Sequence, residues 1–407
     1  MDRMAALEGF RSMVRRYPDG EAIVTPDGQS VSYRDLDRRS DALAAALETR
    51  IPGQRCAVLS LNRIEVIVGM LAAMKRGMAN VQLATRGAPG ELASMISTSD
   101  AMGLLYGQGT ADTAEDVLEQ VDLDLSVCFD AVAGVETYAE LLDTSEPDSL
   151  EIDRTHDESA IFFTSGTTGE SKAIVVDQEQ AWAAAMQPAL EMSVTVDDRA
   201  IVITPWYHMV TTEAWVLPHL LVGATLVLEP DFDPERTLRR IDDEEVTGLL
   251  AVPTQLDALL EAQERVDVGL DTLDYIRTGG AIVSESLIER VRERFTEGVF
   301  NTYGLTEGVG NLTFAYPDEQ HDHPGTIGKA SYLWEVRVVE AADPPAKPDP
   351  GAVVDAGEVG EVIGKSFQMT DGYIGRPEET EALFVDGWLR TGDIARLDQD
   401  GFPVIID

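Results

Sequence analysis

The chain has 407 residues, 44% of them hydrophobic, and a formal net charge of −42. This length exceeds one ordinary domain, so we expect two or three subdomains around a sizeable core. A disordered acidic protein would lack this apolar content, and a negative charge spread along the whole sequence makes nucleic acid and anionic membranes poor partners.

The basic residues are unusual in kind, because only five of the 31 are lysines. An acidic, lysine-poor and still globular sequence indicates a protein adapted to molar salt. There the Debye length falls to about 3 Å and self-repulsion is screened. We therefore expect an extreme halophile as the host and a high-salt cytosol as the location.

The sequence offers little for membrane, disulfide or zinc chemistry. Apolar stretches such as residues 220–228 are too short to span a bilayer, and the N-terminus lacks a signal-peptide pattern, so a cytoplasmic protein is expected. Cys56 and Cys128 each lie in an apolar run, which favours core thiols. His321 and His323 flank an aspartate, where a solvated loop is favoured over a metal site.

The first clear elements in chain order are a strand and a helix. An apolar run at residues 56–59 precedes a helical pattern over residues 66–74. Further strands are predicted, between helix-like stretches, at residues 101–106, 159–163, 200–203, 224–228, 248–252 and 273–278. Repeated βα units predict an α/β fold with two doubly wound, mostly parallel sheets.

After Asn311 the sequence changes to short β-type runs and turns. Runs at residues 334–339 and 358–363 are joined by a proline-rich stretch over residues 343–350. We expect a small β-barrel-like subdomain over residues 321–407. Before it, residues 1–320 would form two intertwined α/β subdomains that divide near residues 180–190.

Residues 164–172 form a loop of small residues closed by a lysine, between strands at residues 161–163 and 173–176. Its glycines permit positive φ and let backbone N–H groups surround an anion, while hydroxyls and one ammonium add donors. A Walker A loop would need a later second glycine and a following helix, which disfavours a P-loop NTPase. The pattern predicts a triphosphate site, with a ligand-free hairpin as the alternative. The donors are Thr164, Ser165, Thr167, Thr168 and Lys172, and the glycines are Gly166 and Gly169.

Four further motifs follow this loop in a fixed order; the first three come after strands and the fourth lies near the end of the chain. Together with the loop they resemble the adenylate-forming superfamily over residues 17–407. The resemblance implies activation of a carboxylic acid with ATP to an acyl adenylate, with release of pyrophosphate, and in most members transfer of the acyl group to a thiol. The motifs are Pro-Trp-Tyr-His at 205–208, Gly-Gly-Ala at 279–281, Tyr-Gly-Leu-Thr-Glu at 303–307 and Trp-Leu-Arg-Thr-Gly-Asp at 388–393.

The resemblance assigns roles to individual residues. Glu307 would bind Mg²⁺ and Thr306 the α-phosphate, because a hard cation prefers carboxylate and phosphate oxygens. Tyr303 would stack on adenine, and Asp393 would accept hydrogen bonds from the ribose hydroxyls. The loop would bind the β- and γ-phosphates through Thr164, Ser165, Gly166, Thr167, Thr168, Gly169 and Lys172. The adenine would lie against Gly279, Gly280, Ala281 and Gly304. His208 would contact the substrate carboxylate, and the acyl pocket would be formed by Trp206, His208, Trp215, Gly304 and residues 252–254.

The sequence departs from the family pattern in two places. Ser171 and Ala173 replace a proline and a glycine beside the lysine, which are small changes that should preserve the loop's path. Beyond the position of Asp407 the family continues into a hinge and a C-terminal domain, which carries a lysine that assists adenylation. We therefore expect this chain to bind nucleotide, to adenylate poorly and to form no thioester.

The favoured function is an ATP-dependent acyl- or aryl-CoA synthetase, with a carboxylic acid, ATP, Mg²⁺ and coenzyme A as its partners. An adenylation domain that loads a carrier protein and a non-catalytic nucleotide-binding module are the alternatives. Residues 211–215 carry no aspartate for an α-amino group, which favours an acid other than an amino acid. The identity of the acid and the formation of a homodimer stay open.

Overall fold

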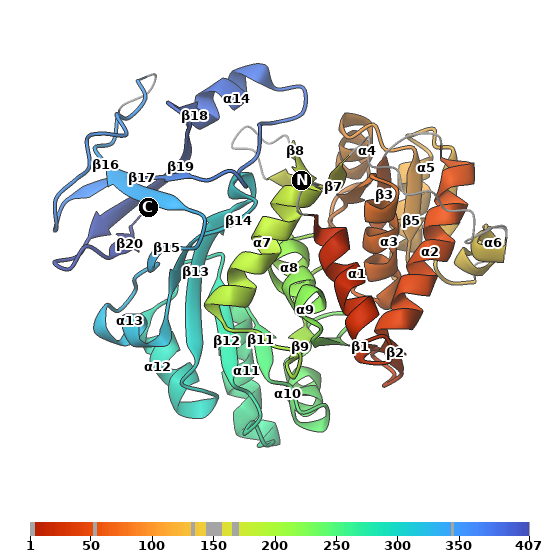
Figure 1. Ribbon diagram of the computed structural model, residues 1–407, viewed down its shortest axis with the longest axis horizontal. Coiled ribbons are helices and arrows are strands. Elements are labelled where there is room, and N and C mark those ends of the chain that lie inside the picture. The colour runs from red at the N-terminus through yellow and green to blue at the C-terminus, as the bar shows by residue number, and fades with distance from the viewer. Residues whose placement is uncertain are drawn as a thin grey trace.

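The structure is a computed structural model that describes residues 5–51, 55–131, 135–143, 157–164, 171–342 and 346–406. These residues form three β-sheets, which follow one another along the long axis of the molecule (Figure 1). Within the described ranges, no helix is both long and apolar enough to cross a membrane.

The first sheet has six strands in the order β6-β5-β3-β4-β7-β8. Its neighbours pair in parallel except for β7 and β8, which form an antiparallel hairpin. The strands predicted at residues 56–59, 101–106 and 159–163 are confirmed here. The strands are β3 (Arg55–Leu59), β4 (Ala79–Gln82), β5 (Gly103–Tyr106), β6 (Leu125–Cys128), β7 (Glu158–Thr164) and β8 (Lys172–Asp177).

The second sheet has nine strands in the order β15-β14-β13-β12-β11-β9-β10-β1-β2. The pairs from β13 to β1 are parallel, and the pairs at both edges are antiparallel. The four strands predicted between residues 200 and 278 are all present. The strands are β1 (Glu21–Val24), β2 (Ser30–Ser32), β9 (Arg199–Val202), β10 (Thr225–Leu228), β11 (Gly248–Leu250), β12 (Tyr275–Gly279), β13 (Val299–Leu305), β14 (Gly310–Ala315) and β15 (Lys329–Ala330).

Both faces of the two large sheets are buried under helices. In β3, Val58 belongs to a central core that also takes side chains from α1, α2, α3, α7 and α9, whereas Ala57 and Leu59 face an outer cluster with α4 and α5. The outer face of the nine-stranded sheet packs against α10, α11 and α12. Burial on both faces explains why these strands read as continuous apolar runs.

The helices begin with local caps where the sequence provides them. Asp177 and Gln180 form a capping box that starts α7 directly after β8, which fixes this helix behind the hairpin. The helices are α1 (Ala6–Arg16), α2 (Tyr33–Arg50), α3 (Ile64–Lys75), α4 (Pro89–Thr98), α5 (Ala111–Leu118), α6 (Tyr138–Asp143), α7 (Gln178–Glu191), α8 (Met209–Thr211), α9 (Leu217–Val222), α10 (Pro234–Asp243), α11 (Pro253–Val266), α12 (Glu285–Arg294), α13 (Pro317–Asp322) and α14 (Pro377–Leu383). A π-helical turn (Thr212–Val216) joins α8 to α9, and a 3-10 turn (Thr306–Gly308) follows β13.

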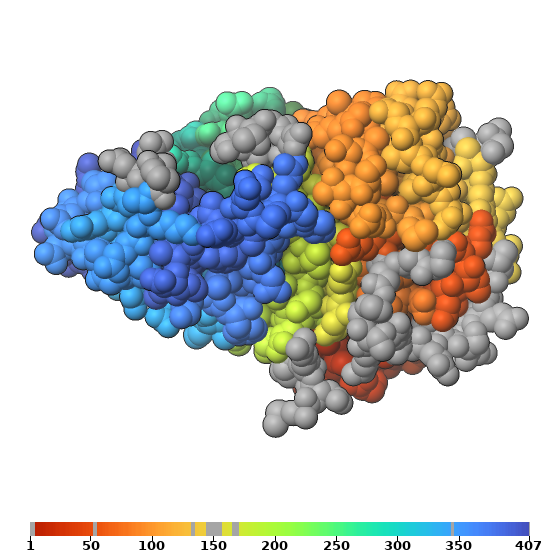
Figure 2. Space-filling view, turned by 90° about the horizontal axis from the view of Figure 1, so that it is seen from above, coloured from red at the N-terminus to blue at the C-terminus, as the bar shows by residue number. Residues whose placement is uncertain are grey.

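The third sheet is small, antiparallel and curled, in the order β16-β17-β19-β18 with β20 paired to β19. Seen from above, its blue residues lie at one end of the molecule and the orange residues around the six-stranded sheet lie at the other (Figure 2). Its strands are β16 (Glu335–Val339), β17 (Val359–Lys365), β18 (Phe384–Val385), β19 (Trp388–Leu397) and β20 (Pro403–Ile405).

The α/β fold class, with two mostly parallel sheets and a small curled sheet, is therefore confirmed. The strand β15 lies past residue 320 and still extends the nine-stranded sheet. The predicted domain boundaries at residue 320 and near residues 180–190 stay predictions.

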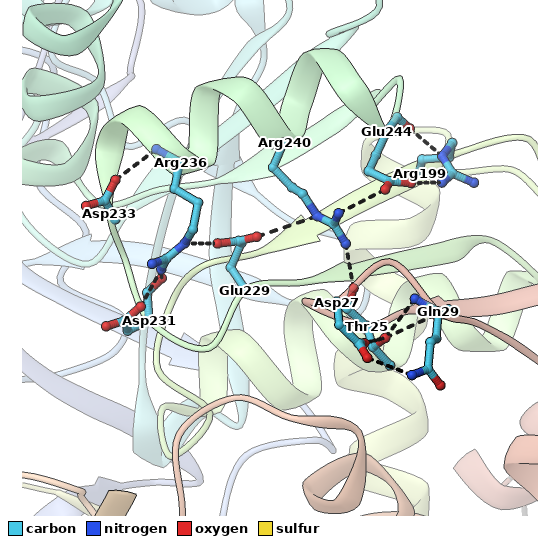
Figure 3. A network of polar contacts seen from close by, with 10 residues as sticks. All are labelled: Thr25, Asp27, Gln29, Arg199, Glu229, Asp231, Asp233, Arg236, Arg240 and Glu244. Atoms are coloured by element: carbon cyan, nitrogen blue, oxygen red, sulfur yellow. Dashed lines mark hydrogen bonds and ion pairs between the residues drawn. The ribbon is translucent and has the colours of Figure 1, made fainter.

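A chain of ion pairs holds α10 to β9 and to the end of β10, two interior strands of the nine-stranded sheet (Figure 3). Glu229 is only 2% exposed and pairs with both Arg236 and Arg240. Arg240 reaches Glu244 at 3.0 Å, and Glu244 pairs with Arg199 of β9, also at 3.0 Å. Alternating charges therefore connect the helix, β9 and the end of β10 through one continuous network.

Candidate functional site

A cavity of about 420 Å³ lies at the carboxyl ends of β9, β11, β12 and β13. In open α/β sheets, ligands bind in the crevice at this edge. The cavity brings together six residues predicted for the site: His208, Val252, Gly279, Gly280, Gly304 and Thr306. Much of the remaining wall is apolar, with Met209, Val210, Ala214, Leu250 and Leu305.

His208 stands on the cavity wall at the start of α8. Its carbonyl accepts hydrogen bonds from the amides of Thr211 at 2.9 Å and Thr212 at 3.3 Å. Its ring packs against Tyr207, with the centroids 4.5 Å apart. The side chain is exposed, yet desolvation by the atoms around it lowers the pKa of His208 below its ordinary value of 6.5. The imidazole is therefore neutral at pH 7 and has one N–H to donate.

Asn62, which the sequence did not single out, fixes the backbone that leads to His208. It follows β3 of the other sheet and is buried. Its amide nitrogen donates to the Thr204 carbonyl at 2.9 Å, and its Oδ1 accepts from the Trp206 amide at 2.8 Å. The only sequence signal was a polar residue placed just after a buried strand.

The glycines at the cavity have separate structural reasons. Gly279 has φ +147°, and a Cβ there would lie 2.1 Å from the Thr302 carbonyl oxygen of β13. Gly280 has φ +73°, with no atom within 4 Å of an added Cβ. Close strand packing thus requires Gly279, while Gly280 keeps the cavity open. Ala281 is exposed and does not belong to the cavity wall.

Tyr303 and Asp393 lie together, although they come from different sheets. The phenol of Tyr303 in β13 donates a 2.5 Å hydrogen bond to Oδ2 of Asp393 in β19. Desolvation and the adjacent carboxylate raise the pKa of Tyr303, so the phenol stays protonated. The two residues predicted for the nucleoside therefore share one place, just outside the cavity wall.

The predicted phosphate loop is the tip of the β7–β8 hairpin, and Thr164 pairs with Lys172 at its base. The tip residues Ser165, Gly166, Thr167, Thr168 and Gly169 lie outside the described residues. The strand-turn-strand prediction is confirmed as far as the two strands reach.

Lys172 and Glu307 both contact a third residue, Tyr373. The Tyr373 phenol donates to Oε1 of Glu307 at 2.6 Å, and the Lys172 ammonium lies 4.9 Å from the centroid of the Tyr373 ring. Two residues predicted for the phosphate site thus contact one aromatic side chain. The sequence did not single out Tyr373, because its partners lie far away in the chain.

Two residues predicted for the acyl pocket lie behind the cavity wall. Trp215 is fully buried, and its indole N–H donates to the Ile201 carbonyl at 2.9 Å. Trp206 is also buried, and neither indole lines the cavity. Within the π-helical turn that contains Trp215, Ala214 is the residue that lines the cavity. Contact of either indole with the acyl group stays a prediction.

A buried arginine, Arg277, ties the cavity walls together. It donates to the Ala214 carbonyl, to Oδ1 of Asn311 at 2.6 Å and to the Thr302 hydroxyl at 3.3 Å. Burial lowers the pKa of Arg277 to about 9, so the side chain is still charged at neutral pH. An arginine inside a strand gave no sequence signal for this role.

The single carboxylate of Glu307 suits a metal ion that arrives bound to a nucleotide. No group of three or more His, Cys, Asp or Glu side chains among the described residues could hold a metal ion. Glu307 is a single carboxylate beside a cavity, which fits Mg²⁺ bound by one carboxylate and phosphate oxygens. His323 instead pairs with Asp398 at 2.7 Å and stacks on Phe402.

Comparisons with known proteins agree with this arrangement. Residues 10–374 match the family of AMP-binding enzymes. A (7a-methyl-1,5-dioxo-octahydroindenyl)propanoyl:CoA ligase of Mycobacterium tuberculosis is 31% identical to this chain. The similarity covers 97% of this chain and 77% of the ligase. Long-chain-fatty-acid--CoA ligase FadD13 of the same organism is 31% identical over 87% of this chain and 68% of its own. The inhibitor-bound N-terminal domain of FACL13 from M. tuberculosis has a TM-score of 0.88 at 27% identity, with 99% of each chain covered.

Proposed function

Because the chain belongs to the family of AMP-binding enzymes, we propose that it is an ATP-dependent carboxylic acid:CoA ligase. The reaction would form an acyl adenylate, release pyrophosphate and then pass the acyl group to CoA. The observation that carries the proposal is one cavity whose wall contains His208, Gly280 and Thr306. A reaction between a nucleotide and a carboxylate needs both reactants held in one place, and this cavity offers that place.

Each side of the cavity has a task in this reaction. His208, with a neutral imidazole, would donate a hydrogen bond to the substrate carboxylate without taking up a proton, which leaves the carboxylate free to attack the α-phosphorus. Thr306 would donate to the α-phosphate. Lys172 and the loop would offset charge on the departing pyrophosphate. Mg²⁺ held by Glu307 would add positive charge at the phosphates when it is bound with ATP.

The nucleoside would lie beside Tyr303 and Asp393. Asp393 is an ionised acceptor with two oxygens, which suits two ribose hydroxyls. Its hydrogen bond to Tyr303 occupies Oδ2 and orients the carboxylate before a nucleotide binds.

The wall favours an alkyl or aryl acid as the substrate. Two relatives that are equally identical to this chain act on a fused-ring propanoyl group and on long-chain fatty acids, so identity does not select between such acids. Loading of a carrier protein and a non-catalytic nucleotide-binding role remain the competing hypotheses. An amino acid is disfavoured because Glu213, the one acid in the π-helical turn, is buried, and its pKa is raised to about 8 by desolvation.

Calorimetry with ATP and MgCl₂ in molar KCl, followed by a pyrophosphate-release assay with a panel of carboxylic acids, tests the proposal. We expect MgATP to bind, and pyrophosphate to be released slowly and only when an acid is present. Lys172→Met should weaken binding, whereas the control Lys365→Met, an exposed lysine at the end of β17, should not.

Three results would point elsewhere. An absence of heat with MgATP would overturn the nucleotide site itself. Binding without pyrophosphate release for any acid would favour the non-catalytic hypothesis. Acyl transfer to a carrier protein but not to CoA would favour the loading hypothesis.

A further inference from the structure

The segment that follows the small sheet's strand β17 runs between two parts of the phosphate site. The Thr370 amide donates to the Glu307 carbonyl at 2.9 Å. Four residues later, the Ile374 amide donates to the Ala173 carbonyl of the hairpin, also at 2.9 Å. The backbone of this segment is therefore attached both to the turn that carries Glu307 and to the strand that begins at Lys172.

Tyr373 lies inside this segment and uses both ends of its side chain. Its hydroxyl reaches Oε1 of Glu307 at 2.6 Å, and its ring carries the Lys172 ammonium at 4.9 Å from the centroid. A phenol hydroxyl is a good donor to a carboxylate, and an aromatic face attracts a cation. One residue thus satisfies two opposite charges with two different chemical groups.

The arrangement keeps these two charges apart. Lys172 and Glu307 are both described residues, and the structure shows no ion pair between them, although both contact Tyr373. A direct ion pair would neutralise the cation needed for phosphate and the carboxylate needed for Mg²⁺. The hydrogen bond to Oε1 also leaves Oε2 of Glu307 without a hydrogen-bond partner among the described residues, and this second oxygen suits a metal ligand.

We propose that Tyr373 is a positioning residue that separates Lys172 from Glu307 and holds the Glu307 carboxylate ready for Mg²⁺ delivered with ATP. This inference rests on the proposed function. It assigns no bond-making step to Tyr373, which acts only through its two neighbours.

ATP binding measured by calorimetry at increasing MgCl₂, and again in EDTA, tests the inference. Tyr373→Phe keeps the ring over Lys172 and removes the hydroxyl from Glu307. We expect that about tenfold more MgCl₂ will be needed to reach half of the Mg²⁺-dependent gain in ATP affinity, since a hydrogen bond to a charged group is lost. ATP binding in EDTA should stay within about twofold of wild type, because the ring still faces Lys172.

Tyr373→Leu removes both contacts and gives the second arm of the test. It should also weaken ATP binding in EDTA, by about threefold to fivefold, because Lys172 loses the ring that holds it. Tyr332→Phe is the matched control, since this tyrosine is 55% exposed and lies outside the site. Melting temperatures of all variants check that each one folds.

Each result decides the matter. A MgCl₂ dependence of Tyr373→Phe equal to wild type would overturn the inference. So would equal weakening with and without Mg²⁺, which is what a merely structural role predicts. Wild-type protein that does not bind MgATP would overturn the proposed function, and a normal wild type with an unchanged variant would overturn only the role of Tyr373.

Discussion

The Tyr303 phenol donates a 2.5 Å hydrogen bond to Asp393 and so joins the nine-stranded sheet to the small curled sheet. The same contact brings together the residue expected to stack on adenine and the residue expected to bind ribose. The Tyr303–Asp393 pair therefore links two sheets and is also the candidate site for the nucleoside, and substitutions can separate these two roles.

Asp393→Asn should lower the affinity for ATP about tenfold to a hundredfold while leaving the fold intact. The amide keeps an oxygen that accepts from Tyr303, but it loses the charge that strengthens hydrogen bonds to ribose hydroxyls, worth about 1.5–3 kcal/mol. Calorimetry with ATP measures the affinity, and urea unfolding measures the stability. Tyr303→Phe serves as the converse control, because it removes the tie and keeps the ring. ATP affinity unchanged in Asp393→Asn would exclude this carboxylate from the nucleoside site.

Asn62→Ala should both destabilise the protein and weaken binding of the acid. The substitution leaves the Trp206 amide and the Thr204 carbonyl without their buried partner, at a cost of about 1–3 kcal/mol for each group left unsatisfied. The loop that ends at His208 would then be held less firmly. Urea unfolding and calorimetry with acid in the presence of ATP measure the two effects.

Asn62→Asp is the second variant for this prediction, since it keeps the acceptor for Trp206 but places a buried carboxylate against the Thr204 carbonyl. Its stability should fall below that of wild type and recover in part as lower pH protonates the carboxylate. Acid binding that is unchanged in Asn62→Ala would show that the loop holds His208 by itself.

The sequence could predict the strands that are buried on both sides. β3 after its first residue Arg55, and β5 over its full length, are short, apolar and followed by helices, so their pattern indicated the parallel sheets. The sequence could not predict how strands pair near the edge of the nine-stranded sheet. β1 has four residues and pairs with β10, about 200 positions later, and no local pattern records such a pairing.

The site divides in the same way. His208, Gly279 and Thr306 fall in motifs after strands, and the structure brings them to one cavity. Tyr373 and Asn62 act on partners 66 and 142 residues away, so tertiary packing alone reveals their roles. Trp215 lies near a motif, which predicts a pocket residue; its large apolar ring is buried in the core behind the cavity wall, and its contact with the acyl group stays a prediction.

Glu213→Gln should raise the free energy of unfolding relative to wild type, and this gain should be larger at alkaline pH than at acid pH. Glu213 is 1% exposed, and burial raises its pKa to about 8 from the ordinary 4.5. The folded state keeps a proton that the unfolded chain releases above pH 4.5, so wild-type stability is lost as pH rises from about 4.5 to about 8. Glutamine has a similar shape and does not titrate.

The difference between Glu213→Gln and wild type should therefore grow with pH, by on the order of 4 kcal/mol at most, since one pKa unit corresponds to about 1.36 kcal/mol. Urea unfolding at pH 5 and pH 8 measures it. Glu264→Gln, on the exposed face of α11, is the matched control and should show no such trend. A constant difference between the two pH values would contradict a protonated Glu213 in the folded protein.

Raising KCl from about 0.1 M to 3 M should raise the melting temperature. The net charge of −42 repels itself in the compact state, and the Debye length shrinks from about 10 Å at 0.1 M to about 3 Å at 1 M. Salt also weakens ion pairs, but exposed pairs contribute only about 0–1 kcal/mol each, so relief of repulsion should dominate. Calorimetric melting at several KCl concentrations checks the sign, and an unchanged melting temperature would contradict adaptation to high salt.

The network in Figure 3 supplies an internal control for this salt effect. Glu229 is almost fully buried between Arg236 and Arg240, so salt screens its ion pairs much less than it screens the surface. Glu229→Gln should lower the melting temperature by a similar amount at low and at high KCl, while both proteins gain stability as KCl rises. A defect that disappears in 3 M KCl would mean that solvent reaches this carboxylate, and that local pairing, instead of net charge, governs the salt response.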